Sequence, residues 1–211
     1  MTPIPLHPPV DALRRVQLIR KAVLLACILG SIALVAVTQS LGGETDLHQG
    51  LELAGLGAIA VCIVGRGWCS LYIGGRKKAE IVDMGPYSIS RNPLYVFSFF
   101  GAFGMGAQTG SLMLAALFVL IAFLVFRATV KKEEAWLADA FGDVYAAYVA
   151  RTPRFWPRFS QWRDREILEV KPAFFLTTIR DGLVFLLAMP LFEGIEHLQD
   201  IGWLRIFVHL P

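Results

Sequence analysis

Two polar segments at the edges of apolar runs hold residue types that could bind a charged ligand. The first covers residues 85–95 and contains a single fixed charge, Arg91. A guanidinium binds a carboxylate or phosphate through paired hydrogen bonds. The second covers residues 127–134 and ends in Glu133 and Glu134, whose carboxylates could accept hydrogen bonds from an ammonium group. We therefore expect the two segments to close over one small ligand that carries both charges at a membrane surface.

These charged residues also have simpler interpretations. Arg91 alone would serve as a positive anchor at the cytoplasmic end of a membrane span. Glu133 and Glu134 would suit the start of a helix, where Lys131 and Lys132 would balance their charge. Helical spacing places Glu134 on one face with Lys131 and points Glu133 elsewhere. The residue types alone therefore leave both interpretations open.

Arg66 is a further candidate because it is a charged residue inside an apolar run, residues 51–73. It lies about eight residues from the end of that run, or roughly 12 Å deep at the helical rise. Charged residues inside a membrane often line a polar cavity, so Arg66 could hold the acid group or headgroup of a substrate. An arginine can also extend its side chain to the membrane surface, and the sequence favours neither interpretation.

The elements that must position these residues are predicted from long apolar runs. Hydrophobic residues make up 55% of the 211 residues, and the mean hydropathy is +0.56, which places the chain in the membrane class. We predict an all-α, multipass transmembrane protein. The expected spans, about five in number, cover residues 21–40, 51–73, 94–107, 112–130 and 172–192.

Two further features of these helices are predicted from the sequence. Residues 94–107 and 112–130 are joined by four polar residues, 108–111, and should form a short helical hairpin. Apolar residues then recur at helical spacing over 133–149, which predicts an amphipathic helix on the cytoplasmic side. Cations alternate with aromatics over 154–159, a pattern typical of an element in the lipid headgroup layer. We expect this helix and residues 153–162 to form a lid over the ligand.

The distribution of charge predicts an orientation for this integral membrane protein. Nearly all lysines and arginines lie in the N-terminal segment and in residues 74–93 and 127–171, whereas residues 42–50 and 108–111 contain none. Positively charged loops face the cytoplasm, so we expect the N-terminus and the candidate site there. The chain divides into three expected parts: an N-terminal basic segment with the first span (1–50), a core (51–158), and a C-terminal linker, fifth span and tail (159–211).

The sequence predicts no metal site, no disulfide and no nucleic-acid partner. The three cysteines all lie in apolar runs without paired spacing, as expected of small apolar residues in membrane spans. The four histidines lie far apart in the sequence, so they suggest no metal cluster; they are His7, His48, His197 and His209.

Several short motifs occur in a defined order. They are Gly85-Pro86-Tyr87-x3-Arg91-Asn92-Pro93-Leu94-Tyr95, then Glu133-Glu134-x2-Leu137 after the hairpin, then Phe141-Gly142-x2-Tyr145-x2-Tyr148, and finally Pro153-Arg154-Phe155. This set, over residues 51–158, resembles the integral-membrane methyltransferases of the isoprenylcysteine carboxyl methyltransferase type, which include phospholipid N-methyltransferases. One position departs from that family, which usually has histidine where this chain has Asn92. Asparagine can form hydrogen bonds but cannot ionise.

The resemblance implies S-adenosylmethionine as the cofactor. Arg91 would then pair with its carboxylate, and Glu133 or Glu134 would pair with its ammonium group. Aromatic rings would contact the adenine or place a π-face near the sulfonium. The expected catalytic residues are Arg66, Arg91 and Glu134. The expected cofactor-binding residues are Tyr87, Arg91, Asn92, Pro93, Tyr95, Glu133, Glu134 and Tyr145.

The resemblance also implies methyl transfer to a lipophilic small molecule or lipid in contact with membrane lipids. The resemblance does not decide whether the methyl acceptor is a prenyl-cysteine carboxylate, a thiol, an isoprenoid acid or a phospholipid amine. It does not decide the oligomeric state either. The alternative is a non-catalytic transporter or scaffold that retains the fold, an interpretation that Asn92 would suit.

Overall fold

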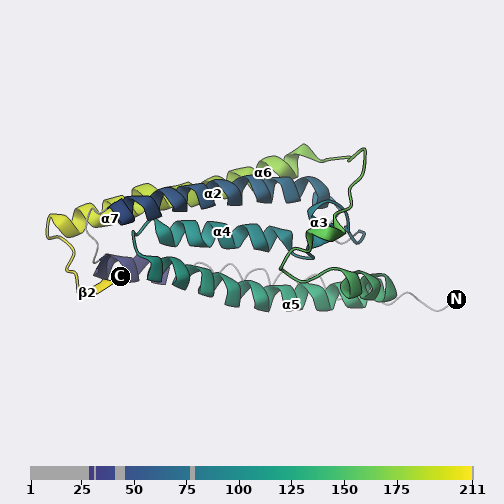
Figure 1. Cartoon of the computed structure of the whole chain (residues 1–211), viewed down its shortest axis with the longest axis horizontal. Coiled ribbons are helices and arrows are strands. Elements are labelled where there is room, and N and C mark those ends of the chain that lie inside the picture. Colours follow the sequence, from purple (N-terminus) through teal and green to yellow (C-terminus); the bar gives the residue numbers. More distant parts are fainter. Residues whose placement is uncertain (1–28, 31, 41–45, 77–78, 211) are drawn as a thin grey trace.

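A computed structural model describes residues 29–30, 32–40, 46–76 and 79–210. Over these residues the chain is a helical bundle with one short pair of parallel strands (Figure 1), so the predicted all-α class is confirmed. Its helices are α2 (Asp46–Ile73), α3 (Pro86–Ile89), α4 (Pro93–Ala107), α5 (Leu112–Arg151), α6 (Pro172–Leu183) and α7 (Ala188–Asp200). The short 3-10 turns are η1 (Phe159–Gln161) and η2 (Val184–Leu187), and the strands are β1 (Thr38–Ser40) and β2 (Val208–Leu210).

Three helical stretches of the described chain are long and apolar enough to cross a membrane: Asp46–Ile73, Leu112–Arg151 and Pro172–Asp200. The last contains α6, η2 and α7, and α4 is a shorter apolar helix. These elements include the spans predicted at 51–73, 94–107, 112–130 and 172–192. Of the span predicted at 21–40, residues 21–28 and 31 lie outside the described residues, and the described part is helical over 29–30 and 32–37 before β1 begins. Many large apolar side chains on the helices are exposed, as expected where lipid rather than water covers the surface.

Helix α4 lies between α2 and α5 (Figure 1), and small residues allow it to approach α2 closely. A Cβ atom added at Gly104 would lie 2.6 Å from the carbonyl oxygen of Gly55. At the end of α4, Gln108 Nε2 donates to the Glu52 carbonyl oxygen at 2.8 Å. Small residues at helix interfaces permit such contact between membrane helices. The hairpin of α4 and α5 is therefore packed directly against α2.

Helix α5 corrects the prediction of a span over 112–130 followed by a separate amphipathic helix over 133–149. The structure continues the first helix past this point, and the 40 residues of Leu112–Arg151 consist of two helices that meet at Gly142. The first helix, residues 112–141, is about 45 Å long at the helical rise, so it extends well beyond a hydrocarbon layer of about 30 Å. The residues at the expected break are lysine, glutamate and alanine, which favour helix. The break between the two helices lies later than predicted, at Gly142, where φ is 49° and ψ is −122°, a conformation that glycine adopts without a Cβ clash.

The segment before α4 is fixed by the chain that follows α5. Tyr148 Oη donates to the Tyr87 carbonyl oxygen at 2.7 Å, and the Arg91 backbone N–H donates to the Pro153 carbonyl oxygen at 2.9 Å. Pro93 occupies the first turn of α4, where its missing N–H costs nothing. Residues 85–92 are therefore held between the start of α4 and the end of α5.

Candidate functional site

The two polar segments identified in the sequence meet in the fold. Arg91 Nη2 lies 3.4 Å from Glu134 Oε1, and the two side chains are only 10% and 12% exposed. Asn92 Nδ2 donates to the same oxygen at 3.4 Å. The other oxygen, Glu134 Oε2, accepts from Arg154 Nε at 3.0 Å and from Arg154 Nη2 at 2.6 Å. A single, largely buried carboxylate therefore contacts two guanidinium groups.

Glu133 also faces this cluster, although helical spacing predicted that it would point elsewhere. Tyr95 Oη donates to Glu133 Oε2 at 3.1 Å. Asn92 and Tyr95 lie one helical turn apart at the start of α4. Asn92 contacts Glu134 and Tyr95 contacts Glu133, so the start of α4 contacts two consecutive residues of α5. Lys131, which was expected to share a face with Glu134, is exposed. Both carboxylates therefore belong to one site.

An aromatic cluster forms one wall of this site. The ring of Tyr95 lies 5.0 Å from that of Phe126, and Phe99 lies 5.7 Å from Phe126. Phe155, which follows α5, lies 5.8 Å from Phe99 and 6.2 Å from Phe123. These rings come from α4, α5 and the following segment, and they keep water from one side of the charged cluster. Charge interactions are stronger where water is excluded.

Several buried polar atoms at this end have no hydrogen-bond partner in the described part of the chain, among them Arg91 Nε, Tyr87 Oη and Tyr145 Oη. Burial raises the pKa of Tyr87 well above its ordinary value, so its hydroxyl stays protonated. Tyr145 is close enough to Glu134 and Arg91 to interact with their charges. Each buried polar group without a partner costs about 1–3 kcal/mol. Unused donors beside a charged cluster fit a site built for a polar ligand.

Arg66, on α2, contacts α4 one helical turn beyond Tyr95. It donates through Nη1 to Ser98 Oγ, which in turn donates to the Leu94 carbonyl oxygen at 2.8 Å. Ser98 follows Tyr95 by one turn of α4, about 4.5 Å along the axis. The structure therefore places Arg66 between α2 and α4, beside the charged cluster but not in direct contact with it.

Arg154 is the site residue that sequence reasoning missed. It was part of the ordered motif, but its alternation with aromatics suggested contact with lipid headgroups. In the structure its hydrogen bonds to Glu134 raise its pKa further above the ordinary arginine value, so it stays charged. The feature of the sequence that indicates its role is its position directly after Pro153, which ends the helix and turns the chain back towards Arg91.

Comparison with known proteins supports a family for the chain. The sequence model of the phospholipid methyltransferase family matches residues 59–144. The chain is 36% identical over 183 residues to the nickel-cobalt-cadmium resistance protein NccN of Alcaligenes xylosoxydans xylosoxydans, a match that covers 86% of this chain and 85% of that protein. It is 39% identical over 156 residues to the cobalt-zinc-cadmium resistance protein CzcN of Cupriavidus metallidurans, covering 74% and 72%.

A shorter match joins the chain to an enzyme named for its reaction. It is 34% identical over 73 residues to the protein-S-isoprenylcysteine O-methyltransferase of Schizosaccharomyces pombe, covering 35% of this chain and 31% of that protein. No solved structure matches the chain. The family match includes both Arg91 and Glu134, the two sides of the charged cluster. The chain therefore belongs to the phospholipid methyltransferase and isoprenylcysteine carboxyl methyltransferase family of integral-membrane methyltransferases.

Proposed function

We propose that this protein transfers a methyl group from S-adenosylmethionine to a lipophilic acceptor at the membrane surface. The contact between Arg91 and Glu134 carries the proposal, because it puts opposite charges side by side in a largely buried place. A ligand with an α-carboxylate and an α-ammonium group needs both. The family match over residues 59–144 supports the same conclusion.

The charged residues would bind the amino-acid end of this cofactor. Arg91 lies 3.4 Å from Glu134, which is longer than the 2.7–2.9 Å typical of a strong charge-assisted hydrogen bond. A ligand carboxylate could therefore take over Arg91 at little cost, while Arg154 keeps its shorter contact with Glu134. Glu133 would accept from the ammonium group beside Tyr95. The unpartnered hydroxyl of Tyr145 offers a further donor to the ligand.

When bound, S-adenosylmethionine would supply an activated methyl group on a positively charged sulfur. The aromatic wall of Tyr95, Phe99 and Phe126 offers π-faces that attract such a cation. Rigid positioning of two reactants accounts for much of the rate of a displacement reaction. A carboxylate or thiolate acceptor needs no strong base. We assign Arg66 to the acceptor, since it lies deeper than Arg91 and carries the charge that would hold an acid group.

The orientation is also part of the proposal. The site lies at the end of the bundle that carries the basic segment 74–93 and the basic stretch 127–171. Positively charged loops remain in the cytoplasm, so the cofactor would enter from that side. The acceptor would enter from the bilayer between the helices.

Calorimetric titration of S-adenosylmethionine into purified protein tests the cofactor site. We expect Arg91→Ala and Glu133→Ala to weaken binding at least 100-fold, about 2.7 kcal/mol, without loss of helical structure. Arg158→Ala and Glu166→Ala are matched controls, because both side chains are exposed and outside the cluster, and we expect their affinity to be unchanged. Equal affinity in all four variants would refute the assignment, as would a wild-type protein that does not bind the cofactor.

A transfer assay identifies the acceptor. The purified protein would be incubated with methyl-labelled S-adenosylmethionine and a membrane lipid extract, and the labelled product analysed by mass. Label in a lipophilic product that is absent with Arg91→Ala supports the reaction. Cofactor binding without any labelled product would favour the non-catalytic alternative.

A second candidate function is resistance to divalent metals, favoured by the names of the two relatives that match most of the chain. We propose that methyl transfer by this protein would contribute to such resistance. The test compares growth in nickel, cobalt or cadmium with wild-type protein and with Arg91→Ala. Resistance from the wild type alone would link it to the transfer site. Equal resistance from both would show that it does not depend on methyl transfer.

A further inference from the structure

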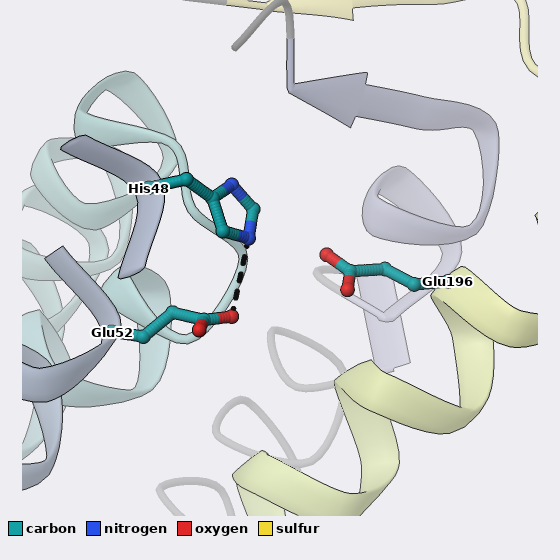
Figure 2. Close-up of side chains that lie close together, drawn as sticks. All are labelled: His48, Glu52 and Glu196. Carbon is teal, nitrogen blue, oxygen red and sulfur yellow. Dashed lines mark ion pairs between the residues drawn. The ribbon is translucent and has the colours of Figure 1, made fainter. Parts of the chain in front are cut away.

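A cluster of three potential metal ligands lies at the end of the bundle opposite the charged site. His48 and Glu52 come from the first turns of α2, and Glu196 comes from α7. One ligand atom from each residue lies within 4.8 Å of the other two, and Figure 2 shows the three side chains pointing towards one another. His48 Nε2 lies 3.2 Å from Glu52 Oε1. We propose that these residues form a binding site for a divalent transition-metal cation such as Zn²⁺.

The spacing of the donor atoms suits one ion. Zinc binds imidazole nitrogen and carboxylate oxygen at about 2.0–2.2 Å. Two ligands of a tetrahedral ion are therefore about 3.4 Å apart, by the geometry of those bond lengths. The separation of His48 and Glu52 is already 3.2 Å. Since Glu196 lies within 4.8 Å, only a small movement of its side chain would complete the site.

The chemistry of the three ligands selects a class of metal. Magnesium and calcium prefer oxygen ligands alone. Imidazole together with carboxylates suits zinc, cobalt and nickel, and the remaining coordination positions would hold water. Two neighbouring carboxylates repel one another, and a divalent cation between them removes that repulsion. A simple ion pair of His48 and Glu52 would explain their contact, but it gives no role to Glu196.

The ligands on α2 are held in place by the turn between α4 and α5. Gly110 in that turn has a φ of 64°, and a Cβ atom there would overlap the His48 ring, so the imidazole packs directly against the turn. The same turn fixes the Glu52 backbone, because Gln108 Nε2 donates to its carbonyl oxygen at 2.8 Å. Rigid support of this kind favours metal binding, since the ligand side chains lose less conformational entropy when the ion binds.

The ligand on α7 is also supported. Gln199 lies one turn after Glu196, and its Nε2 donates to the carbonyl oxygens of Val35, Ala36 and Thr38 at 3.1, 3.2 and 3.1 Å. These bonds fix α7 beside the segment that leads into β1. A bound cation would add a direct link between α7 and α2.

The proposed metal site is independent of the proposed methyl transfer. His48 and the end of α2 at Ile73 are separated by almost the whole helix, about 38 Å at the helical rise. Figure 1 shows α7 at one end of the bundle and α3 at the other. A protein that does not bind metal could therefore still bind S-adenosylmethionine. A protein that does not bind S-adenosylmethionine could likewise still bind metal.

The test is titration of Zn²⁺ into the full-length protein in detergent after removal of any histidine tag. We expect one Zn²⁺ to bind per chain, and Co²⁺ to give a visible absorption band at the same stoichiometry. Glu196→Gln and His48→Gln should each weaken binding at least tenfold, because each removes a ligand. The matched controls are Glu193→Gln and His197→Gln, whose side chains are exposed on the same helix α7, and they should bind as the wild type does.

A stability measurement adds a second readout. A ligand that binds only the folded protein stabilises it by an amount that grows with the logarithm of the ligand concentration relative to its Kd, so Zn²⁺ should raise the Tm of the wild type and of both controls. It should raise the Tm of Glu196→Gln much less. If His48→Gln does not fold, Glu52→Gln replaces it in the titration. The proposal is overturned if no saturable Zn²⁺ binding occurs, or if Glu196→Gln binds Zn²⁺ as tightly as Glu193→Gln.

Discussion

Arg91 Nη2 lies 3.4 Å from Glu134 Oε1, with both side chains about nine-tenths buried. The same carboxylate also accepts two hydrogen bonds from Arg154. Two guanidinium groups thus share one carboxylate, and Arg91 Nε has no partner among the described residues. The unused donor of Arg91 suits a ligand carboxylate. This arrangement is the basis for the predictions on cofactor binding below.

Arg154→Lys tests the arginine that the sequence did not single out. The substitution keeps the positive charge but loses the paired donation to Glu134 Oε2, and lysine cannot reproduce that geometry. We expect S-adenosylmethionine affinity to fall about tenfold, equivalent to roughly 1.4 kcal/mol, as measured by calorimetry. Arg158→Lys is the control, because Arg158 is exposed. An Arg154→Lys protein with wild-type affinity would show that charge alone is enough at this position.

Tyr95→Phe tests the role of Glu133. The change removes the hydroxyl that donates to Glu133 Oε2 at 3.1 Å and keeps the ring packed on Phe126. A hydrogen bond to a charged group contributes about 1.5–3 kcal/mol, so we expect cofactor affinity to fall about tenfold or more by titration.

Tyr148→Phe is the comparison for Tyr95→Phe. It removes a hydroxyl that donates to the Tyr87 backbone at 2.7 Å and contacts neither glutamate. We expect it to lower the unfolding temperature more than it lowers cofactor affinity. If the two variants have the same effect on affinity, Tyr95 acts through the fold and not through Glu133.

Ser98→Ala tests the assignment of Arg66 to the acceptor. The substitution removes the oxygen that accepts from Arg66, so the guanidinium loses its partner between α2 and α4. We expect the KM for the lipophilic acceptor to rise several-fold while cofactor affinity is unchanged. Thr177→Ala, at an exposed position on α6, is the control. A change in cofactor affinity with no change in acceptor KM would contradict the assignment.

Gly104→Ala tests the close packing of α2 and α4. The added Cβ would lie 2.6 Å from the Gly55 carbonyl oxygen and 2.6 Å from the Ile59 side chain. Overpacking of this kind costs about 1–3 kcal/mol, so the unfolding temperature in detergent should fall. Gly57→Ala is the matched control, because nothing lies within 4 Å of its added Cβ. Equal stability of the two variants would show that α4 can shift away from α2 without cost.

Much of the membrane-helix architecture was predictable because it depends on local sequence. A run of apolar residues favours a helix in lipid whatever lies elsewhere in the chain, since every backbone polar group must be bonded within the segment. The predicted span at 51–73 and the helical hairpin after Pro93 follow from this. Even the continuity of α5 through Lys131 to Ala135 is a local property, because the lysines, glutamates and alanine at these positions all favour helix.

The contacts across the bundle were decided by the tertiary structure alone. Helical spacing on α5 separated Glu133 from Glu134, but the start of α4 reaches both. Histidine spacing suggested no metal site, whereas the fold brings α7 and its Glu196 to the first turns of α2. The sequence determined which residues carry charge and which segments are helical. Only the packing of those helices decided which charges meet, because their side chains are distant along the chain and adjacent only when small residues let the helices approach.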